Sequence, residues 1–463
     1  MYSRNIFDNI SPREHRYSLP GGEFAEYAEF LSEKASIEYQ ARVEGALVKV
    51  LARRGICSQE VAREIQAAIE QITPEEVYEE ELKTRHDIRA LVNCIQRKVS
   101  PAARPYVHFT TTSFDIVDTA NSLRFREVSE KLLLPKLYEL EKLLMEIALR
   151  EKDTLQIGRT HGQHAVPITF GFAMAEYVSR LGNRIREVRE KSQKLVGKIA
   201  GAVGAYNASY LFFADPEEFE KEVLAELGLE PGPVSTQIVE PEPMTDFIHA
   251  LVSCFGVLAN LSDDMRHLQR SEIGEVGEYF AAEQVGSSTM PHKRNPINYE
   301  NVKSLWKKFM PGMVTVYMDQ ISEHQRDLTN SASARFLPEI AAGLLMAVQR
   351  LQRVLGRMQV DKENLRKNFD LSKEMIVAEP LYILLASHGH PDAHEAVRRL
   401  TLEAEQKGVP LRELLQEKEE LKAYWERFTE KQRDLLLNPE CYTGIAADKT
   451  VRVVEYWKEE LGI

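Results

Sequence analysis

Apolar residues recur at helical spacing along most of the chain. From residue 23 to about residue 53 they lie three and four positions apart, which predicts an amphipathic helix. Ser58 is placed to cap the next helix, and Thr73, followed by proline and two glutamates, is placed to cap another. A further helix is predicted over 87–99, where prolines follow closely. The first hundred residues therefore predict a series of helices.

In the middle of the chain the apolar residues keep near-heptad spacing over longer windows. These windows are 133–147, 177–188, 247–265, 302–316 and 337–354. Long helices with such apolar stripes pack as a near-parallel bundle. After Asp361 the windows become shorter and are interrupted by glycine and proline.

This pattern predicts an all-α protein of three helical domains with a central long-helix bundle. At 463 residues the chain is long for one compact core. The expected domains are 1–107, 108–358 and 359–463. No region of strand period competes with the helices, although short strands fit in the connections.

Composition narrows the class of protein. Hydrophobic residues make up 43% and charged residues 28%, as in soluble globular proteins. The net charge of -12 argues against nucleic acid as the main partner, so an anionic substrate requires a local cluster of basic residues. We find no apolar run of transmembrane length and no signal segment, and therefore expect no membrane partner and a cytoplasmic location. The four cysteines lie far apart, which predicts reduced, mostly buried thiols.

Candidate chemistry is densest in the segment 286–296, Gly-Ser-Ser-Thr-Met-Pro-His-Lys-Arg-Asn-Pro. Its prolines exclude a helix interior, because proline lacks a backbone N–H and clashes with the preceding turn. Lys293 and Asn295 lie two positions apart, so in an extended backbone they point the same way. A positive charge beside a neutral amide suits a carboxylate. The alternative is a surface loop with incidental polar residues.

A second candidate segment is Thr-His-Gly-Gln-His at 160–164, expected as a loop that begins at Gly158. His161 and His164 could share a zinc ion, but no third ligand or glutamate base accompanies them, and no metal is expected. His164 is expected to pack or to hydrogen-bond locally. Three histidines near 388–394 are expected to form a turn and a helix start.

The segment 286–296 resembles the signature of the fumarase/aspartase superfamily, whose members eliminate fumarate or a related acid from a succinyl compound. The segment 160–164 resembles the superfamily's Thr-His-Gly segment, and its Gln-His-Ala-Val-Pro continuation is close to the adenylosuccinate lyases. Further matches to that family are Arg85-His86-Asp87, the block 108–120, Arg16-Tyr17, Ser235-Thr236-Gln237 and Gln325-Arg326-Asp327 with Ser331 and Arg335. The resemblance covers roughly residues 13–444.

The resemblance implies a fumarase/aspartase-like fold and a homotetramer with active sites shared between subunits. It implies β-elimination of fumarate from adenylosuccinate, giving AMP, and from SAICAR, giving AICAR, with no cofactor. His161 would be the catalytic acid and Ser287 the catalytic base. The residues expected to bind substrate are Arg16, Tyr17, Arg85, His86, Asp87, His108, Thr112, Ser113, Gln237, Lys293, Asn295, Arg326, Ser331 and Arg335.

Two features depart from the family pattern. Many bacterial relatives carry glycine where this chain has Thr110, which allows a different loop backbone there. After Gln237 a basic run is replaced by Glu-Pro-Glu-Pro-Met at 240–244, so Glu240 and Glu242 either point away from an anionic substrate or alter its pocket. The alternatives are therefore another superfamily lyase, such as argininosuccinate lyase or carboxymuconate cycloisomerase, and a non-catalytic scaffold like some lens crystallins.

Overall fold

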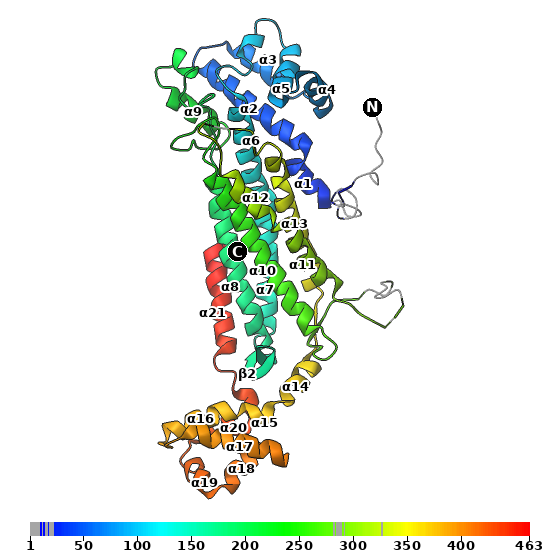
Figure 1. Ribbon diagram of the computed structural model, residues 1–463, viewed down its shortest axis with the longest axis vertical. Helices are drawn as coiled ribbons and strands as arrows, with labels where there is room; N and C mark the ends of the chain where they lie inside the picture. The colour runs from blue at the N-terminus through cyan, green and yellow to red at the C-terminus, as the bar shows by residue number, and fades with distance from the viewer. Residues whose placement is uncertain are drawn as a thin grey trace. The chain divides into compact units, whose positions relative to one another are not determined.

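The computed structural model describes residues 10, 11, 13, 17, 23–280, 283, 289, 290, 292–325 and 327–463 (Figure 1). The chain forms two compact units. Unit 1 comprises Met1–Tyr138, Asn183–Gly256 and Ser304–Gln349, and unit 2 comprises Glu139–Gly182, Val257–Lys303 and Arg350–Ile463. The division into three domains at 107 and 358 stays a prediction.

The first part of the chain is a series of helices, as the pattern predicts. They are α1 Glu23–Leu31, α2 Glu33–Arg53, α3 Gln59–Ile69, α4 Pro74–Thr84, α5 Asp87–Arg97 and the 3-10 turn η3 Arg104–Tyr106. The single helix predicted over 23–53 is wrong, because Ser32 ends one helix and caps the next by accepting a hydrogen bond from the Ala35 N–H. The caps predicted at Ser58 and Thr73 are confirmed.

Long helices follow in the middle of the chain. They are α6 Ser113–Val128, a π-helical turn Ser129–Leu133, α7 Leu134–Arg150, α8 Phe170–Gln193, α10 Glu242–Leu268, α11 Ile297–Phe309, α12 Gly312–Asp319 and α13 Leu337–Leu355. The π turn precedes Pro135, which has no N–H for a regular helical hydrogen bond. The window predicted over 302–316 is two helices, since Pro311 cannot continue the first.

Short elements connect these helices. They are the hairpin β1 Leu155–Thr160 and β2 Gln163–Thr169, the strand pair β3 Val276–Gly277 and β4 Gln359–Val360, α9 Pro216–Ala225, and the 3-10 turns η5 Ser209–Leu211 and η6 Ser333–Phe336. Both strand pairs are antiparallel. The loop predicted to begin at Gly158 is therefore a hairpin with Gly158 inside its first strand. A side chain at Gly158 would meet the Val166 carbonyl oxygen, so glycine is required where the register shifts.

The last hundred residues form shorter helices, as predicted. They are α14 Lys362–Asp370, α15 Lys373–Ile376, α16 Ala378–Ser387, α17 Ala393–Lys407, α18 Leu411–Glu417, α19 Glu419–Trp425, α20 Glu430–Leu437, the 3-10 turn η7 Pro439–Cys441 and α21 Ala446–Leu461. Helices α16 to α20 share their own hydrophobic core, which includes Leu385, Leu400 and Leu411. Helix α21 instead runs beside α8, where Trp457 covers Gly182 (Figure 1).

One helix bears on the membrane expectation. Helix α10 is long and apolar enough to cross a membrane by length and composition alone. Its most apolar window is 61% buried within the protein, as in the core helix of a globular fold. Three of the four cysteines, Cys57, Cys94 and Cys254, are buried and unbridged, as predicted.

Replacing Gly182 with alanine should loosen the contact between α8 and α21. The added Cβ would lie 2.5 Å from two atoms of the Trp457 ring, so the ring must move. We expect a loss of about 1–3 kcal/mol, the usual cost of overpacking. The control is Gly256→Ala in α10, where the nearest atom, in Trp306, is 3.8 Å away. That change should be neutral or stabilise by roughly 0.5–1 kcal/mol. Thermal melting distinguishes the two, and equal melting temperatures would contradict the packing argument.

Candidate active site

The predicted site residues divide between the two units. Unit 1 contains Tyr17, Arg85, His86, Asp87, His108, Thr112, Ser113, Gln237, Ser331 and Arg335. Unit 2 contains His161, Lys293 and Asn295. Arg16, Ser287 and Arg326 lie outside the described residues.

In unit 1 the Arg-His-Asp segment meets the start of α6. His86 is the N-cap of α5, its Nδ1 accepting a hydrogen bond from the Arg89 N–H, while its Nε2 lies 3.4 Å from Ser113 Oγ. Arg85 adopts a left-handed backbone (φ 56°) that ends α4. The structure therefore brings the Arg-His-Asp segment and the predicted hydroxyl pair into contact.

A buried glutamate holds His108. Glu44 in α2 accepts the His108 backbone N–H (3.0 Å) through Oε2, and its Oε1 lies 2.6 Å from the ring Nδ1. Burial lowers the pKa of the His108 imidazole, but the charge and hydrogen bond of Glu44 outweigh it, so the pKa lies above its usual value. His108 is thus favoured as a cation.

The predicted hydroxyl pair begins a helix that a buried carboxylate caps. Thr112 is the N-cap of α6, and its N–H donates to Asp115 Oδ2 (2.8 Å). The other Asp115 oxygen pairs with the buried Lys198 and accepts the N–H groups of Ala200 and Gly201. Asp115 therefore ties the loop before α6 to the segment 198–201.

The same loop keeps a glycine-like backbone without glycine. Thr110 has φ 64°, in the left-handed region, and His108 has φ 62°. The buried hydroxyls of Thr110 and Thr111 have no hydrogen-bond partner among the described residues. Thr110 thus adopts the backbone conformation that glycine favours.

The two glutamates in the segment 240–244, where the sequence departs from the family pattern, lie in different surroundings. Glu242 is exposed and accepts a hydrogen bond from Gln320 (3.5 Å). Glu240, by contrast, lines a cavity of about 100 Å³ together with Asp118, Asp319 and Asn330. Further along the same segments, the Gln237 N–H donates to the Gln325 carbonyl oxygen (3.4 Å). The departure therefore places Glu240 at a cavity beside the block that contains Ser331.

In unit 2, His161 lies at the exposed tip of the hairpin. Strand residues Thr160 and Gln163 pair directly, leaving His161 and Gly162 as a two-residue turn. Both turn residues have positive φ, 54° and 72°, the pattern of a type I′ turn. His161 is thus held in a strained but defined position. His164 Nδ1 lies 2.7 Å from Ser372 Oγ, so it does form a hydrogen bond, but with a partner 208 positions away rather than the local one predicted.

Glu275 anchors this hairpin. Its fully buried carboxylate pairs with both terminal nitrogens of Arg159, two residues before His161, at 2.6 and 3.1 Å. It also accepts hydrogen bonds from Gln156 of β1 and Asn368 of α14. Arg159 is thereby fixed by charge-assisted, bidentate bonding.

The signature segment borders a basic hollow of about 820 Å³. Lys293 and Asn295 both line it. The other basic residues that line it are Arg266, Arg270, His292 and Arg294. Glu272 and Glu300 are its acidic members, so positive charge predominates and suits a dicarboxylate.

Two side chains fix the end of this segment. Gln269 receives the Glu278 N–H and donates to the Arg294 carbonyl oxygen (3.4 Å). Glu278 accepts the N–H groups of Asn298 and Tyr299 at the start of α11 (2.9 and 3.1 Å). The loop's exit is therefore capped by a carboxylate, which the helix dipole favours.

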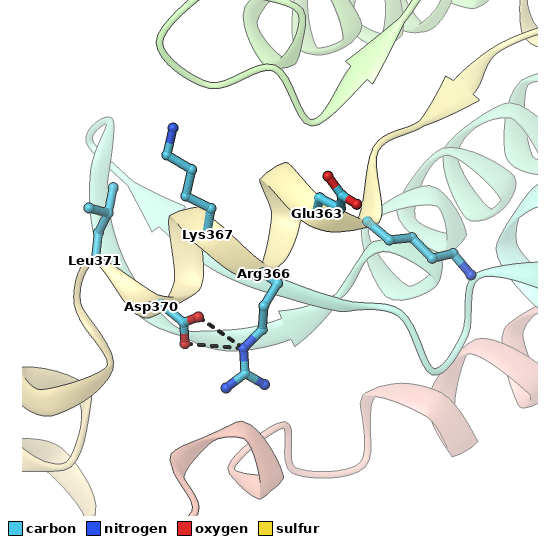
Figure 2. Close-up of a pocket in the computed structure, with 6 residues that line it drawn as sticks. Glu363, Arg366, Lys367, Asp370 and Leu371 are labelled. Atoms are coloured by element: carbon cyan, nitrogen blue, oxygen red, sulfur yellow. Dashed lines mark hydrogen bonds and ion pairs between the residues drawn. The ribbon is translucent and has the colours of Figure 1, made fainter.

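A second hollow, of about 670 Å³, runs along α14 but carries none of the predicted residues (Figure 2). Its side chains are exposed, and Arg366 pairs with Asp370 one turn away (3.1 Å). This is a solvated helix face. The histidines at 388–394 form the expected turn and helix start, with Asp392 capping α17.

Sequence reasoning missed the carboxylates that hold these loops, Glu44, Asp115, Glu275 and Glu278. Only Glu44 had a clear signal. It stands at helical spacing among Ile37, Ala41, Val48 and Leu51, all buried, where an apolar residue is expected.

An all-helical fold with these motifs in its connections is typical of the fumarate lyases. Fumarate lyase from Mesorhizobium sp. BNC1 matches the structure with a TM-score of 0.82 and 25% identity, over 93% of this chain and 97% of that one. The 3-carboxy-cis,cis-muconate lactonizing enzyme from Pseudomonas putida matches with a TM-score of 0.81 and 26% identity, over 94% and 97%. The predicted fold class is confirmed.

Sequence comparison identifies the family. The Lyase family model matches residues 23–310, and the adenylosuccinate lyase C-terminal model matches residues 322–443. Adenylosuccinate lyase of Archaeoglobus fulgidus is 35% identical over 98% of this chain and 99% of its own, and that of Pyrococcus abyssi 36% over 97% and 98%. The chain therefore belongs to the adenylosuccinate lyase family, and it is a C–N lyase.

Glu275→Gln should destabilise unit 2, because it leaves the Arg159 guanidinium beside a neutral partner. Breaking one side of a buried pair costs about 3–5 kcal/mol. Adding Arg159→Met to that variant should recover part of the loss, since no unpaired charge then remains. The urea midpoint of both variants measures this. An unchanged midpoint in Glu275→Gln would show that the pair does not hold the hairpin.

Proposed function

We propose that this chain eliminates fumarate from adenylosuccinate, giving AMP, and from SAICAR, giving AICAR. The observation that carries the proposal is the basic hollow that Lys293 and Asn295 line, because the succinyl part of both substrates is a dicarboxylate. The full-length likeness to adenylosuccinate lyases supports the nucleotide part of the substrate.

The chemistry requires two proton transfers. Ser287, as alkoxide, takes the proton from the succinyl carbon, the electron pair forms the double bond of fumarate, and the C–N bond breaks. His161 gives a proton to the departing nitrogen. Lys293 and Asn295 bind the carboxylates, where their donors stabilise the charge that develops in the transition state. Binding of the nucleotide falls to the unit 1 residues and to Arg16 and Arg326.

Another superfamily lyase is the second candidate, favoured by one observation. Glu240, Asp118 and Asp319 are three acidic residues that line a cavity next to Ser331, where we expect the substrate's phosphate to bind. A succinyl substrate without a phosphate, such as argininosuccinate, would avoid that repulsion. A cytoplasmic location stays a prediction.

Fumarate release, followed by absorbance, tests the function with adenylosuccinate, SAICAR and argininosuccinate, and the loss of carboxymuconate absorbance tests cycloisomerisation. Turnover of the two purine substrates is expected, and Lys293→Met should raise their KM at least about tenfold, since a charge-assisted contact contributes about 1.5–3 kcal/mol. Lys367→Met removes another exposed lysine, from the α14 hollow, and should change nothing (Figure 2). Turnover of argininosuccinate alone would favour the second candidate, and no turnover at all would favour a scaffold.

The family resemblance leads us to propose a homotetramer whose sites combine residues from different subunits. Ser287→Ala and His161→Ala should each abolish kcat while leaving substrate binding largely intact, since each removes a proton-transfer group and little binding surface. Mixing the two inactive variants should restore part of the activity through hybrid tetramers. Verified subunit exchange without recovery of activity, or a fully active monomer, would exclude shared sites.

A further inference from the structure

Glu44 occupies a position where a carboxylate is costly. It lies inside helix α2, 2% exposed, on the stripe that also carries Ala41 and Val48. A charge in such a place is expected only where a specific partner compensates its lost hydration. The only partner of Glu44 among the described residues is His108, which lies 64 positions away in sequence.

The contact has two points and fixes both the backbone and the ring of His108. One Glu44 oxygen accepts the backbone N–H, which stabilises a left-handed conformation (φ 62°) that non-glycine residues rarely adopt. The other lies 2.6 Å from Nδ1. Because a carboxylate only accepts, Nδ1 carries a proton directed at Glu44. The second ring nitrogen, Nε2, has no partner within the described part of the chain.

The charged groups around the ring come from three helices. Glu44 of α2 and Asp115 of α6 favour the imidazolium, and Arg89 of α5 opposes it. Burial of the imidazole also opposes the cation, but the charge and hydrogen bond of Glu44 outweigh it, so the pKa of His108 lies above its usual value. The stability that the pair contributes is fully present below the pKa of His108 in the unfolded chain. It is lost as pH rises through the higher pKa of the folded chain.

We propose that Glu44 is a positioning residue of the active site, which holds His108 as a cation with Nε2–H presented to the anionic substrate. The inference rests on the proposed function, since it needs an anionic substrate at this loop. Glu44 touches no substrate itself. It acts through the orientation and the charge of one imidazole.

Glu44→Gln tests the proposal, with Glu44→Asp as the conservative variant. The matched control is Glu127→Gln, which removes a carboxylate bonded to Tyr39 and Arg42 on the same helix α2. In Glu44→Gln we expect KM to rise about tenfold with a smaller change in kcat. The alkaline limb of kcat/KM should move to lower pH. Glu44→Asp should recover part of both, and Glu127→Gln should lower the melting temperature without either effect.

Deuterium exchange at the imidazole C2 atom, measured by mass spectrometry on the intact chain, reports the titration of His108 without turnover. Its midpoint should fall in Glu44→Gln and stay in place in Glu127→Gln. An unchanged midpoint in Glu44→Gln overturns the inference, as does a shifted midpoint with unchanged KM and pH profile. Failure of the unmodified chain to turn over any succinyl substrate would instead remove the proposed function.

Discussion

Burial of a carboxylate against a cation from a loop is the constraint on which the candidate site depends. Asp115 and Lys198 are both almost fully enclosed, so neither charge can recover its hydration if the other moves. Breaking such a pair costs about 3–5 kcal/mol, against a typical total stability of roughly 5–15 kcal/mol. The loop before α6 therefore cannot rearrange independently of the segment that carries Lys198.

The same arrangement offsets backbone strain. His108, Thr110 and His161 all hold positive φ without being glycine, at about 1–2 kcal/mol each. His108 itself belongs to a buried ion pair, with Glu44. His161 lies two residues after Arg159, which pairs with the buried Glu275. Strained residues persist only where the surroundings over-determine their conformation, which these pairs do.

The sequence predicts features set by neighbouring residues better than it predicts contacts between distant residues. The cap at Thr73 and the long helices follow from residue type and period, and the superfamily follows from dense motifs. The hairpin around His161 was missed because its turn lacks the asparagine-glycine or aspartate-glycine pair that marks a type I′ turn. The helix break at Pro311 was overlooked because the helical spacing of apolar residues continues across it. The partner of Glu44 could not be found, because nothing local relates a helix position to a loop 64 residues later.

Burial of a charge by itself does not mark a functional residue. Glu141 in α7 also replaces an apolar residue on a buried stripe, between Leu137 and Leu144, and is fully enclosed. Neither of its oxygens has a hydrogen-bond partner in the part of the chain that the structure describes, and burial raises its pKa well above the usual value, which favours the neutral acid. Glu44 has a partner, and that partner is a strained residue in the block 108–120, which resembles a motif of the family. The difference lies in the pairing, because only a paired carboxylate transmits charge and orientation to the loop that it holds.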